Sequence, residues 1–435
     1  MRFLRQTNGE NGESGGWQFR LPSTFAALRH RNFQLFYFGQ LVSLIGTWMQ
    51  GTAQPWLVYT VLDQPKFMLG AISAIGMAPV LFLSLLGGVV ADRLDKRRIV
   101  IIAQTVYMFL ALGLGVLIHL HLIQVWHVAL FAALGGIVAS FEMPARQAMV
   151  VELVGKRDLM NAITLNSSSF NAARVVGPAI AGMLIASLGM VGCYYANSAS
   201  YLAVIVGVLL IRLPPREQPA QTASISDHLR EGLSYVRGLP ALRTLLTALA
   251  VSGIFAMSFP VLMPVFARDI LFAGQPDQAA RGFGFLLAAS ALGAVIGGLV
   301  MASSSERRDK ATWAIGGLLL LSSMQIAFSF STWFWLSFLF AFFTGWGMIS
   351  FAASSNTLLQ TLTPDEYRGR VMGIYALVWM GSSPIGALQA GTLAEHLGAP
   401  EAVRIGASIC ALTALLMLPK RKLIREAERR MQQAS

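Results

Sequence analysis

Twelve runs of about 20 mostly apolar residues recur along this chain of 435 residues, and each is long enough to cross a bilayer as a helix. The runs lie near residues 33–60, 67–91, 99–119, 125–145, 161–187, 192–212, 243–268, 282–303, 311–330, 333–356, 371–396 and 401–419. In lipid, a helix satisfies every backbone polar group within the segment. The sequence therefore predicts an all-α membrane protein with 12 transmembrane helices and both chain ends on one side.

Composition excludes the other broad classes of protein. Hydrophobic residues make up 55% of the chain and charged residues 12%, with a mean hydropathy of +0.59. That leaves too little polar surface for a soluble globular protein. The two cysteines, Cys193 and Cys410, lie far apart in apolar runs and indicate small core residues rather than a disulfide framework.

The positive charges predict the orientation of the chain. Of 33 Lys and Arg residues, 28 fall in inner segments if both termini are cytoplasmic, and Arg174 lies inside a span. The four in outer loops are Lys66, Arg268, Arg281 and Arg404. By the positive-inside rule we expect a multi-pass protein of the plasma (cell) membrane with both termini cytoplasmic. The net charge of +12 then needs no nucleic-acid partner.

The two halves of the chain repeat each other. A shift of 209 residues superposes small residues and prolines of spans one and five on those of spans seven and eleven: Ser43 on Ser252, Pro55 on Pro264, Gly177 on Gly386 and Gly182 on Gly391. Because glycine and proline coincide at corresponding depths, we interpret the chain as two pseudo-symmetric six-helix bundles in parallel duplication. This arrangement is typical of one large group of secondary transporters.

The duplication divides the chain into five parts. They are a cytoplasmic N-terminal segment (1–32), an N-terminal six-helix bundle (33–212), a cytoplasmic linker (213–242), a C-terminal six-helix bundle (243–419) and a basic cytoplasmic tail (420–435). In the linker, apolar residues from Ile225 to Val236 recur at helical spacing. This spacing predicts an amphipathic helix on the cytoplasmic face rather than a plain tether.

The loop after span two carries a motif. Residues 87–98 read GGVVADRLDKRR, which resembles the signature loop of the major facilitator superfamily, with Asp95 at the position of the usual second glycine. The resemblance implies that the loop aspartate, Asp92, holds the cytoplasmic side closed by facing Arg146 and the helix that begins near Arg370. The alternative is a set of positive-inside charges with no gate. The candidate gating residues are Asp92, Arg93, Arg97 and Arg146.

Three further strings resemble one branch of that superfamily, the transmembrane secretion effectors, which include bacterial enterobactin exporters. They are residues 28–33 (LRHRNF), 143–148 (MPARQA) and 366–373 (EYRGRVMG). The resemblance covers nearly the whole chain from Leu28 and implies the major facilitator superfamily fold.

A Gly-Pro motif in span five resembles that of drug/proton antiporters. It consists of Gly177, Pro178 and Gly182. Proline removes a backbone donor and bends a helix, while glycine permits close approach of a neighbouring helix. We interpret the motif as a helix kink that favours export, and a packing kink without directional meaning is the alternative.

Arg174 lies inside span five, where a charge costs ~2.5 to 3.5 kcal/mol unless it faces a wet cavity or an anion. It continues a polar stripe with Asn171, so both are candidates for the substrate path. The alternative partner for Arg174 is Glu142 or a carbonyl group between helices. Glu142 is also the membrane-embedded acid best placed to couple transport to protons.

Polar and aromatic stripes in spans one and eleven are also expected to line the central cavity. The candidates are Gln50 and Gln54 in span one, and Tyr375, Trp379 and Gln389 in span eleven. Amides and aromatic rings together suit an amphipathic organic substrate. Helix packing through small polar residues is the alternative.

These features predict a secondary active transporter that exports a small organic molecule such as a siderophore or drug by alternating access. The family resemblance implies that export is coupled to protons. An importer or a lipid flippase of the same fold is the alternative, and a non-transporting membrane protein would leave the polar stripes unexplained. The sequence shows no phosphate-binding loop, metal-binding spacing or catalytic cluster. We therefore expect no cofactor and no enzyme, with a small-molecule substrate, protons and the lipid bilayer as partners of a monomer.

Overall fold

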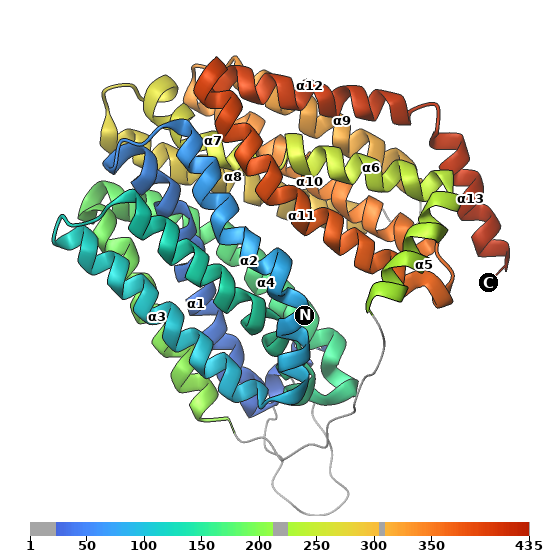
Figure 1. The fold of residues 1–435 in the computed structure, drawn as a ribbon, viewed down its shortest axis with the longest axis horizontal. Helices are drawn as coiled ribbons and strands as arrows, with labels where there is room; N and C mark the ends of the chain where they lie inside the picture. Colours follow the sequence, from blue (N-terminus) through green and yellow to red (C-terminus); the bar gives the residue numbers. More distant parts are fainter. Residues whose placement is uncertain (1–22, 212–224, 304–308, 435) are drawn as a thin grey trace, which may run out of the picture.

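The computed structural model describes residues 23–211, 225–303 and 309–434, which form helices and short connections without any β-strand (Figure 1). Most of the predicted N-terminal segment and the first part of the linker lie outside the described residues. Throughout, the terminal side is the side on which α1 begins and α12 ends, and the far side is the opposite one.

The N-terminal half contains six crossings in four helices. Its elements are η1 (Ser23–Arg29), α1 (Arg31–Trp56), the π-turn η2 (Leu57–Val61), α2 (Lys66–Arg93), α3 (Lys96–His119) and α4 (Val125–Leu209). Helix α4 is interrupted at Gly155 (φ +68°) and Gly189 (φ +73°), in the left-handed region that favours glycine. We call its three crossings α4a (125–154), α4b (156–188) and α4c (190–209).

The C-terminal half contains the other six crossings. They are α6 (Pro240–Phe255) continued by α7 (Phe259–Val265) and the π-turn η3 (Phe266–Leu271), then α8 (Pro276–Ser303), α9 (Lys310–Ser329), α10 (Phe334–Thr361), α11 (Asp365–Leu397) and α12 (Ala399–Met417). The predicted fold of twelve helices in two six-helix bundles is confirmed. By length and apolar composition, nine described helices can span a membrane; the three crossings of α4 count there as one helix, and α1 is not among the nine.

Two amphipathic helices flank the C-terminal half on the terminal side. Helix α5 (Ile225–Gly238) packs on the start of α11, where Glu231 pairs with Arg370 at 2.8 Å and the Tyr235 and Tyr367 rings stack at 4.5 Å. Helix α13 (Arg421–Ala434), within the predicted tail, packs on α9 and α10. Both segments are therefore docked on the bundle through side-chain contacts.

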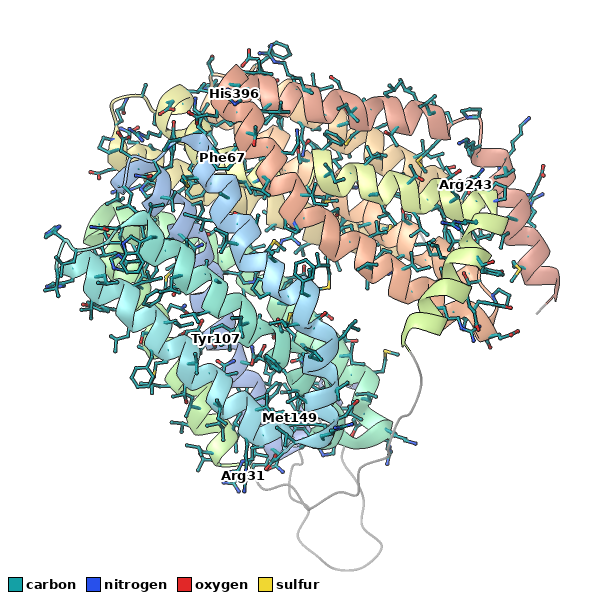
Figure 2. All side chains as sticks on the ribbon, viewed as in Figure 1. Arg31, Phe67, Tyr107, Met149, Arg243 and His396 are labelled. Atoms are coloured by element: carbon teal, nitrogen blue, oxygen red, sulfur yellow. The ribbon has the colours of Figure 1, made fainter. Side chains whose placement is uncertain are left out.

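The two halves pack together at the far side and diverge toward the terminal side. One hydrophobic cluster takes buried residues from both halves, among them Trp56, Phe266 and Ala390, whereas a second lies wholly in the C-terminal half and a third wholly in the N-terminal half. Figure 2 shows Phe67 and His396 near the joined end, with Met149 and Arg243 well apart. The described residues therefore form a V that is open toward the terminal side (Figure 1).

Candidate functional site

A pocket of about 450 Å³ lies inside the N-terminal half, between α1, α2, α3 and α4. Its polar lining comes from Thr47, Gln50, Gln54, Ser73, Tyr107, Asn197 and Tyr201, and its apolar lining includes Ile72, Met77, Leu110, Leu114 and Phe131. The Ser383 hydroxyl of α11 lies 3.1 Å from the Met77 sulfur, so the pocket borders the other half. The predicted Gln50 and Gln54 thus face a cavity lined by amides, phenols and apolar side chains.

Hydrogen bonds hold the polar groups of this pocket in place. The Asn197 side-chain amide donates to the Gln50 carbonyl oxygen at 2.6 Å and to the Tyr201 hydroxyl at 3.3 Å. Thr47 lies 3.4 Å from the same hydroxyl, and the rings of Tyr107 and Tyr201 stack at 5.7 Å. Such fixed donors and acceptors among apolar walls can orient an amphipathic organic molecule.

Glu142 lies about two helical turns beyond Gly135 of this pocket along α4a, toward the terminal side. Its side chain is 7% exposed and pairs with Arg146, the next turn of α4a, with 2.9 Å between Oε1 and Nε. The Gln104 amide lies 3.5 Å from the same carboxylate oxygen, and the Ser43 hydroxyl 3.4 Å from Gln104 Oε1. A polar network therefore connects a buried ion pair on α4a with α3 and α1.

Arg174 on α4b is half-buried. Among the described residues, none accepts a hydrogen bond from its guanidinium or forms an ion pair with it. Glu142, its predicted alternative partner, pairs with Arg146 instead. One turn away, the Asn171 amide donates to the Ser167 carbonyl at 2.8 Å, within the same helix. Arg174 is thus a cation in the membrane region without a described protein counter-charge.

The Gly-Pro motif of α4b provides close contacts with two helices. A Cβ atom on Gly177 would lie 2.6 Å from the Trp48 Cβ of α1, and one on Gly182 would lie 2.8 Å from the Ala280 carbonyl oxygen of α8. The backbone stays helical at Pro178, and the non-helical residues of α4 are the two glycines at its breaks. Gly182 therefore contributes to the joint between the halves, while a directional kink stays a prediction.

The signature loop is held within the N-terminal half. Asp95 caps the N-terminus of α3 by accepting from the Arg97 backbone amide at 2.9 Å, which gives the unusual acid in the motif a structural role. The Arg97 side chain donates to the Val208 and Leu209 carbonyls at 3.0 and 2.7 Å, where α4c ends. Such cationic donors stabilise the negative end of a helix. Arg97 therefore joins two helices of one half.

The partners predicted for Asp92 make other contacts in this open arrangement. Arg146 pairs with Glu142, and Arg370 pairs with Glu231 of α5. Asp92 and Arg93 each make a contact as well. The gate on the terminal side, which includes Asp92 and Arg93, stays a prediction for the closed state.

The span-eleven residues lie in α11 and do not line the N-terminal pocket. The rings of Tyr375 and Trp379 stack at 6.2 Å and pack against the core of the C-terminal half. Gln389 is half-buried near the far side, where α11 packs on α2. The structure does not bring these residues together with Gln50 and Gln54 in one pocket.

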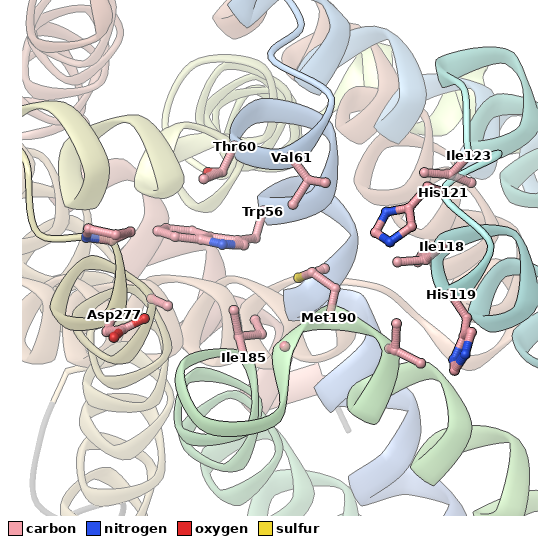
Figure 3. Close-up of a pocket in the computed structure, with 14 residues that line it drawn as sticks. Trp56, Thr60, Val61, Ile118, His119, His121, Ile123, Ile185, Met190 and Asp277 are labelled. Carbon is pink, nitrogen blue, oxygen red and sulfur yellow. The ribbon is translucent and has the colours of Figure 1, made fainter.

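Sequence reasoning missed the contacts on the far side. A crevice of about 590 Å³ lies there between the halves, lined by Trp56, Thr60, His119 and His121 from one half and Asp277 from the other (Figure 3). Figure 3 shows Trp56 between Asp277 and His121. Beside the crevice, Arg268 reaches across to the Tyr59 carbonyl oxygen of η2. The sequence signal for this contact was the 209-residue shift, which superposes Tyr59 on Arg268.

Comparison with known families decides the identity of this architecture. Residues 22–435 match the family model described as transmembrane secretion effector. The chain belongs to the transmembrane secretion effector family of major facilitator superfamily transporters. The predicted family is confirmed.

Several transporters resemble this chain along most of its length. The multidrug efflux pump Tap of Mycolicibacterium fortuitum is 27% identical, covering 84% of this chain and 89% of Tap. The staphyloferrin A transporter of Staphylococcus aureus is 25% identical, with 89% and 96% covered. The enterobactin exporter EntS of Shigella flexneri is 26% identical, with 91% and 94% covered.

Solved structures of other transporters share the fold. A bacterial homologue of the human lysosomal transporter Spinster, in an inward-facing and unoccupied conformation, superposes with a TM-score of 0.66 at 15% identity, covering 95% of this chain and 98% of that one. A POT family transporter in complex with a thioalcohol-conjugated peptide gives a TM-score of 0.71 at 12% identity, covering 91% and 96%.

Proposed function

We propose that this transmembrane secretion effector is a proton-coupled exporter of a small amphipathic organic molecule, working by alternating access in the cell membrane with both termini in the cytoplasm. The observation that carries this proposal is the pocket of amides, phenols and apolar walls in a molecule that is open on the terminal side. A substrate from the cytoplasm could then approach Gln50, Gln54 and Asn197 from the side where the halves diverge.

The direction and the class of substrate are supported by the relatives and by charge. Tap is a multidrug efflux pump and EntS exports enterobactin, so efflux of organic molecules occurs among the similar proteins. The concentration of Lys and Arg on the terminal side supports a cytoplasmic location for that side. Arg174 would attract an anionic or polar group of the substrate.

Glu142 is the residue we propose to carry the coupling proton. It is a buried carboxylate paired with Arg146, and protonation would remove its charge and release the arginine. Through Gln104 and Ser43 the released pair would affect α3 and α1, which line the pocket. Proton binding and substrate binding are thereby linked in one bundle. A monomer suffices for this mechanism.

Transport by inverted membrane vesicles tests the proposal. Vesicles containing the protein are given siderophores and lipophilic drugs, with a proton gradient imposed or collapsed. We expect gradient-dependent uptake of at least one compound, and no such uptake by vesicles with the Glu142→Gln variant. Uptake of no compound by folded protein would contradict export, and uptake into right-side-out vesicles would indicate an importer or a flippase.

A further inference from the structure

Each half of the molecule has a π-turn at the far end of its first membrane crossing. These are η2 (Leu57–Val61) and η3 (Phe266–Leu271), and the 209-residue shift superposes Leu57 on Phe266. Each begins two residues after a proline, Pro55 or Pro264. Proline removes a backbone donor and so favours departure from regular α-helical bonding. The two turns are thus equivalent elements of the duplicated chain.

The two π-turns contact each other across the boundary between the halves. Arg268 donates to the Tyr59 carbonyl oxygen at 2.7 Å and to the Asp63 carboxylate at 3.0 Å, and its guanidinium carbon lies 4.9 Å from the centre of the Tyr59 ring. The Tyr59 hydroxyl donates to Asp269, the residue after Arg268. We call Tyr59, Asp63, Arg268 and Asp269 the far-side latch.

The latch closes over an apolar joint. Leu57 and its counterpart Phe266 are both 0% exposed and belong to the hydrophobic cluster shared by the halves. Trp56 stacks on Phe283 of α8 at 5.6 Å and lines the neighbouring crevice (Figure 3). Outside this apolar layer, the side chain of Arg268 is 35% exposed and that of Asp63 is 80% exposed. The polar contacts therefore seal the rim and the apolar side chains seal the interior.

We propose that the paired π-turns are the far-side gate of the transport cycle and that Arg268 is the positioning residue that keeps this gate closed. The inference rests on the proposed alternating-access function. To open the far side, the chain must separate Tyr59 from Arg268, which are equivalent positions of the two halves. On opening, Arg268 loses its contacts with the Tyr59 carbonyl, the Asp63 carboxylate and the Tyr59 ring at once. Replacing Arg268 therefore removes interactions made only in the far-side-closed state and shifts the equilibrium toward the far-side-open state.

Asp63 is adapted to this contact. Its φ of +49° lies in the left-handed region, which aspartate and asparagine adopt more readily than most residues. The chain can therefore turn sharply after the π-turn and present the carboxylate to Arg268. An Asp63→Asn variant retains the conformational preference and the side-chain shape while losing the charge, so it separates the ion pair from the turn.

Arg404 is a matched control within one half. Like Arg268, it pairs with a carboxylate, Glu401, and lies over an aromatic ring, 4.6 Å from the centre of Phe330. All three groups belong to the C-terminal half, so Arg404→Gln removes the same chemistry without affecting the joint.

Spin-label distances test the gate without a known substrate. One pair of labels on the far side replaces exposed Leu122 and Gln278, and a second pair on the terminal side replaces exposed Met160 and Leu418. The native cysteines Cys193 and Cys410 are both 0% exposed and do not compete for the label. The distances are compared in Arg268→Gln, Arg268→Lys, Asp63→Asn and Arg404→Gln.

We expect Arg268→Gln to raise the ratio of far-side-open to far-side-closed molecules about fivefold or more, with Asp63→Asn smaller in the same direction. The ratio for Arg268→Lys should lie between those of Arg268→Gln and the native chain, because lysine keeps the charge but lacks the planar, forked hydrogen-bond donors of arginine. Arg404→Gln should match the native chain. If the far-side label distances of Arg268→Gln and Asp63→Asn equal those of Arg404→Gln and the native chain, the gate proposal is overturned.

The outcome is separable from that of the transport assay. If Arg268→Gln opens the far side but no compound is transported by the native protein, the gate stands and the exporter proposal fails. If the native protein exports a compound while every latch variant retains the native distances, transport stands and the latch proposal fails.

Discussion

The polar side chains buried in the membrane region are in two different situations. Glu142 and Arg146 neutralise each other, and Gln104 approaches the carboxylate as well. Arg174 is half-buried without a described partner. Removing one member of a buried pair leaves an uncompensated charge, whereas removing an unpaired charge relieves a desolvation cost. The same type of substitution should therefore have opposite effects on stability at the two sites.

Neutralising Glu142 as Gln should destabilise the protein by about 2 kcal/mol, because Arg146 is left largely buried without its carboxylate. The double variant Glu142→Gln/Arg146→Gln should recover most of the loss. Thermal unfolding in detergent measures both. Glu401→Gln, which breaks a more exposed pair, is the control and should cost less than about 1 kcal/mol. A double variant no more stable than the single one would contradict the pairing.

Neutralising Arg174 as Gln should leave thermal stability equal or slightly higher, since the side chain loses no described partner and no longer carries a charge in the membrane. Transport should nevertheless be lost if Arg174 attracts the substrate, and Arg174→Lys should retain part of it. Parallel measurements of melting temperature and vesicle uptake check this combination. A destabilised Arg174→Gln variant would instead indicate a structural role.

The N-terminal caps of α3 and α9, which are equivalent helices of the two halves, differ in what else they bind. Asp95 and Asp309 each cap a helix, α3 and α9, by accepting a backbone hydrogen bond. In the C-terminal half, Asp309 also accepts from Arg421 at 3.0 Å and lies 3.3 Å from Arg425, both on α13. Glu428 of α13 pairs with Lys310 at 2.9 Å. The cap of α9 is therefore also the docking point of the C-terminal helix.

Asp309→Asn should weaken the docking of α13 by about 1 to 2 kcal/mol while retaining the cap, because asparagine also caps helices. Partial burial raises the pKa of the Asp309 carboxyl, but hydrogen bonds from Thr312, Arg421 and Ala311 outweigh it and hold the pKa below its ordinary value. A lowered folded-state pKa gives stability that is present above the ordinary pKa and is lost as pH falls through the folded value.

The melting temperature of Asp309→Asn should therefore fall below that of the native chain at pH 7, and the gap should narrow once the pH drops below about 4. Asp95→Asn is the matched control, because it has the same cap and an exposed partner, Arg98, at 3.6 Å. A gap independent of pH would show that charge is not what holds α13.

The contact between the two halves depends on backbones that approach closely at the far side. Gly182 of α4b lies against the backbone of α8, and Gly70 of α2 lies against that of α11 at Ala387. These joints and the far-side latch hold the V together, while the clusters of each half are separate toward the terminal side. Alternating access requires this joint to open while each half keeps its own core.

Gly182→Val should force the halves apart at the far side, because its Cβ would lie 2.8 Å from the Ala280 carbonyl oxygen and 3.1 Å from the Arg281 Cα. We expect a loss of about 1 to 3 kcal/mol, measured by thermal unfolding, together with longer far-side label distances. Gly88→Val on α2, where a Cβ would meet no atom within 4 Å, is the control. Identical effects of the two variants would contradict the close joint.

Twelve helices, their duplication and the family could be predicted from the chain, because these depend on local properties. A run of apolar residues becomes a helix in lipid whatever its neighbours are, and Gly and Pro at matching depths show the repeat. The interpretation of Gln50 and Gln54 as cavity residues needed only helical spacing, and both line a pocket.

The partners of the charged residues could not all be predicted from local sequence properties. Arg146 joins a glutamate four residues away, Arg97 joins carbonyls more than a hundred residues away, and Arg268 joins a tyrosine in the other half. The pairings of Arg97 and Arg268 depend on how helices distant in sequence are packed, and that of Arg268 also depends on which side of the molecule is closed. The pairing of Arg146 is local, and what the packing decides is that this pair is buried beside Gln104 of α3. Local hydrophobicity specifies that a helix crosses the membrane, whereas the choice of neighbour is a property of the packed assembly.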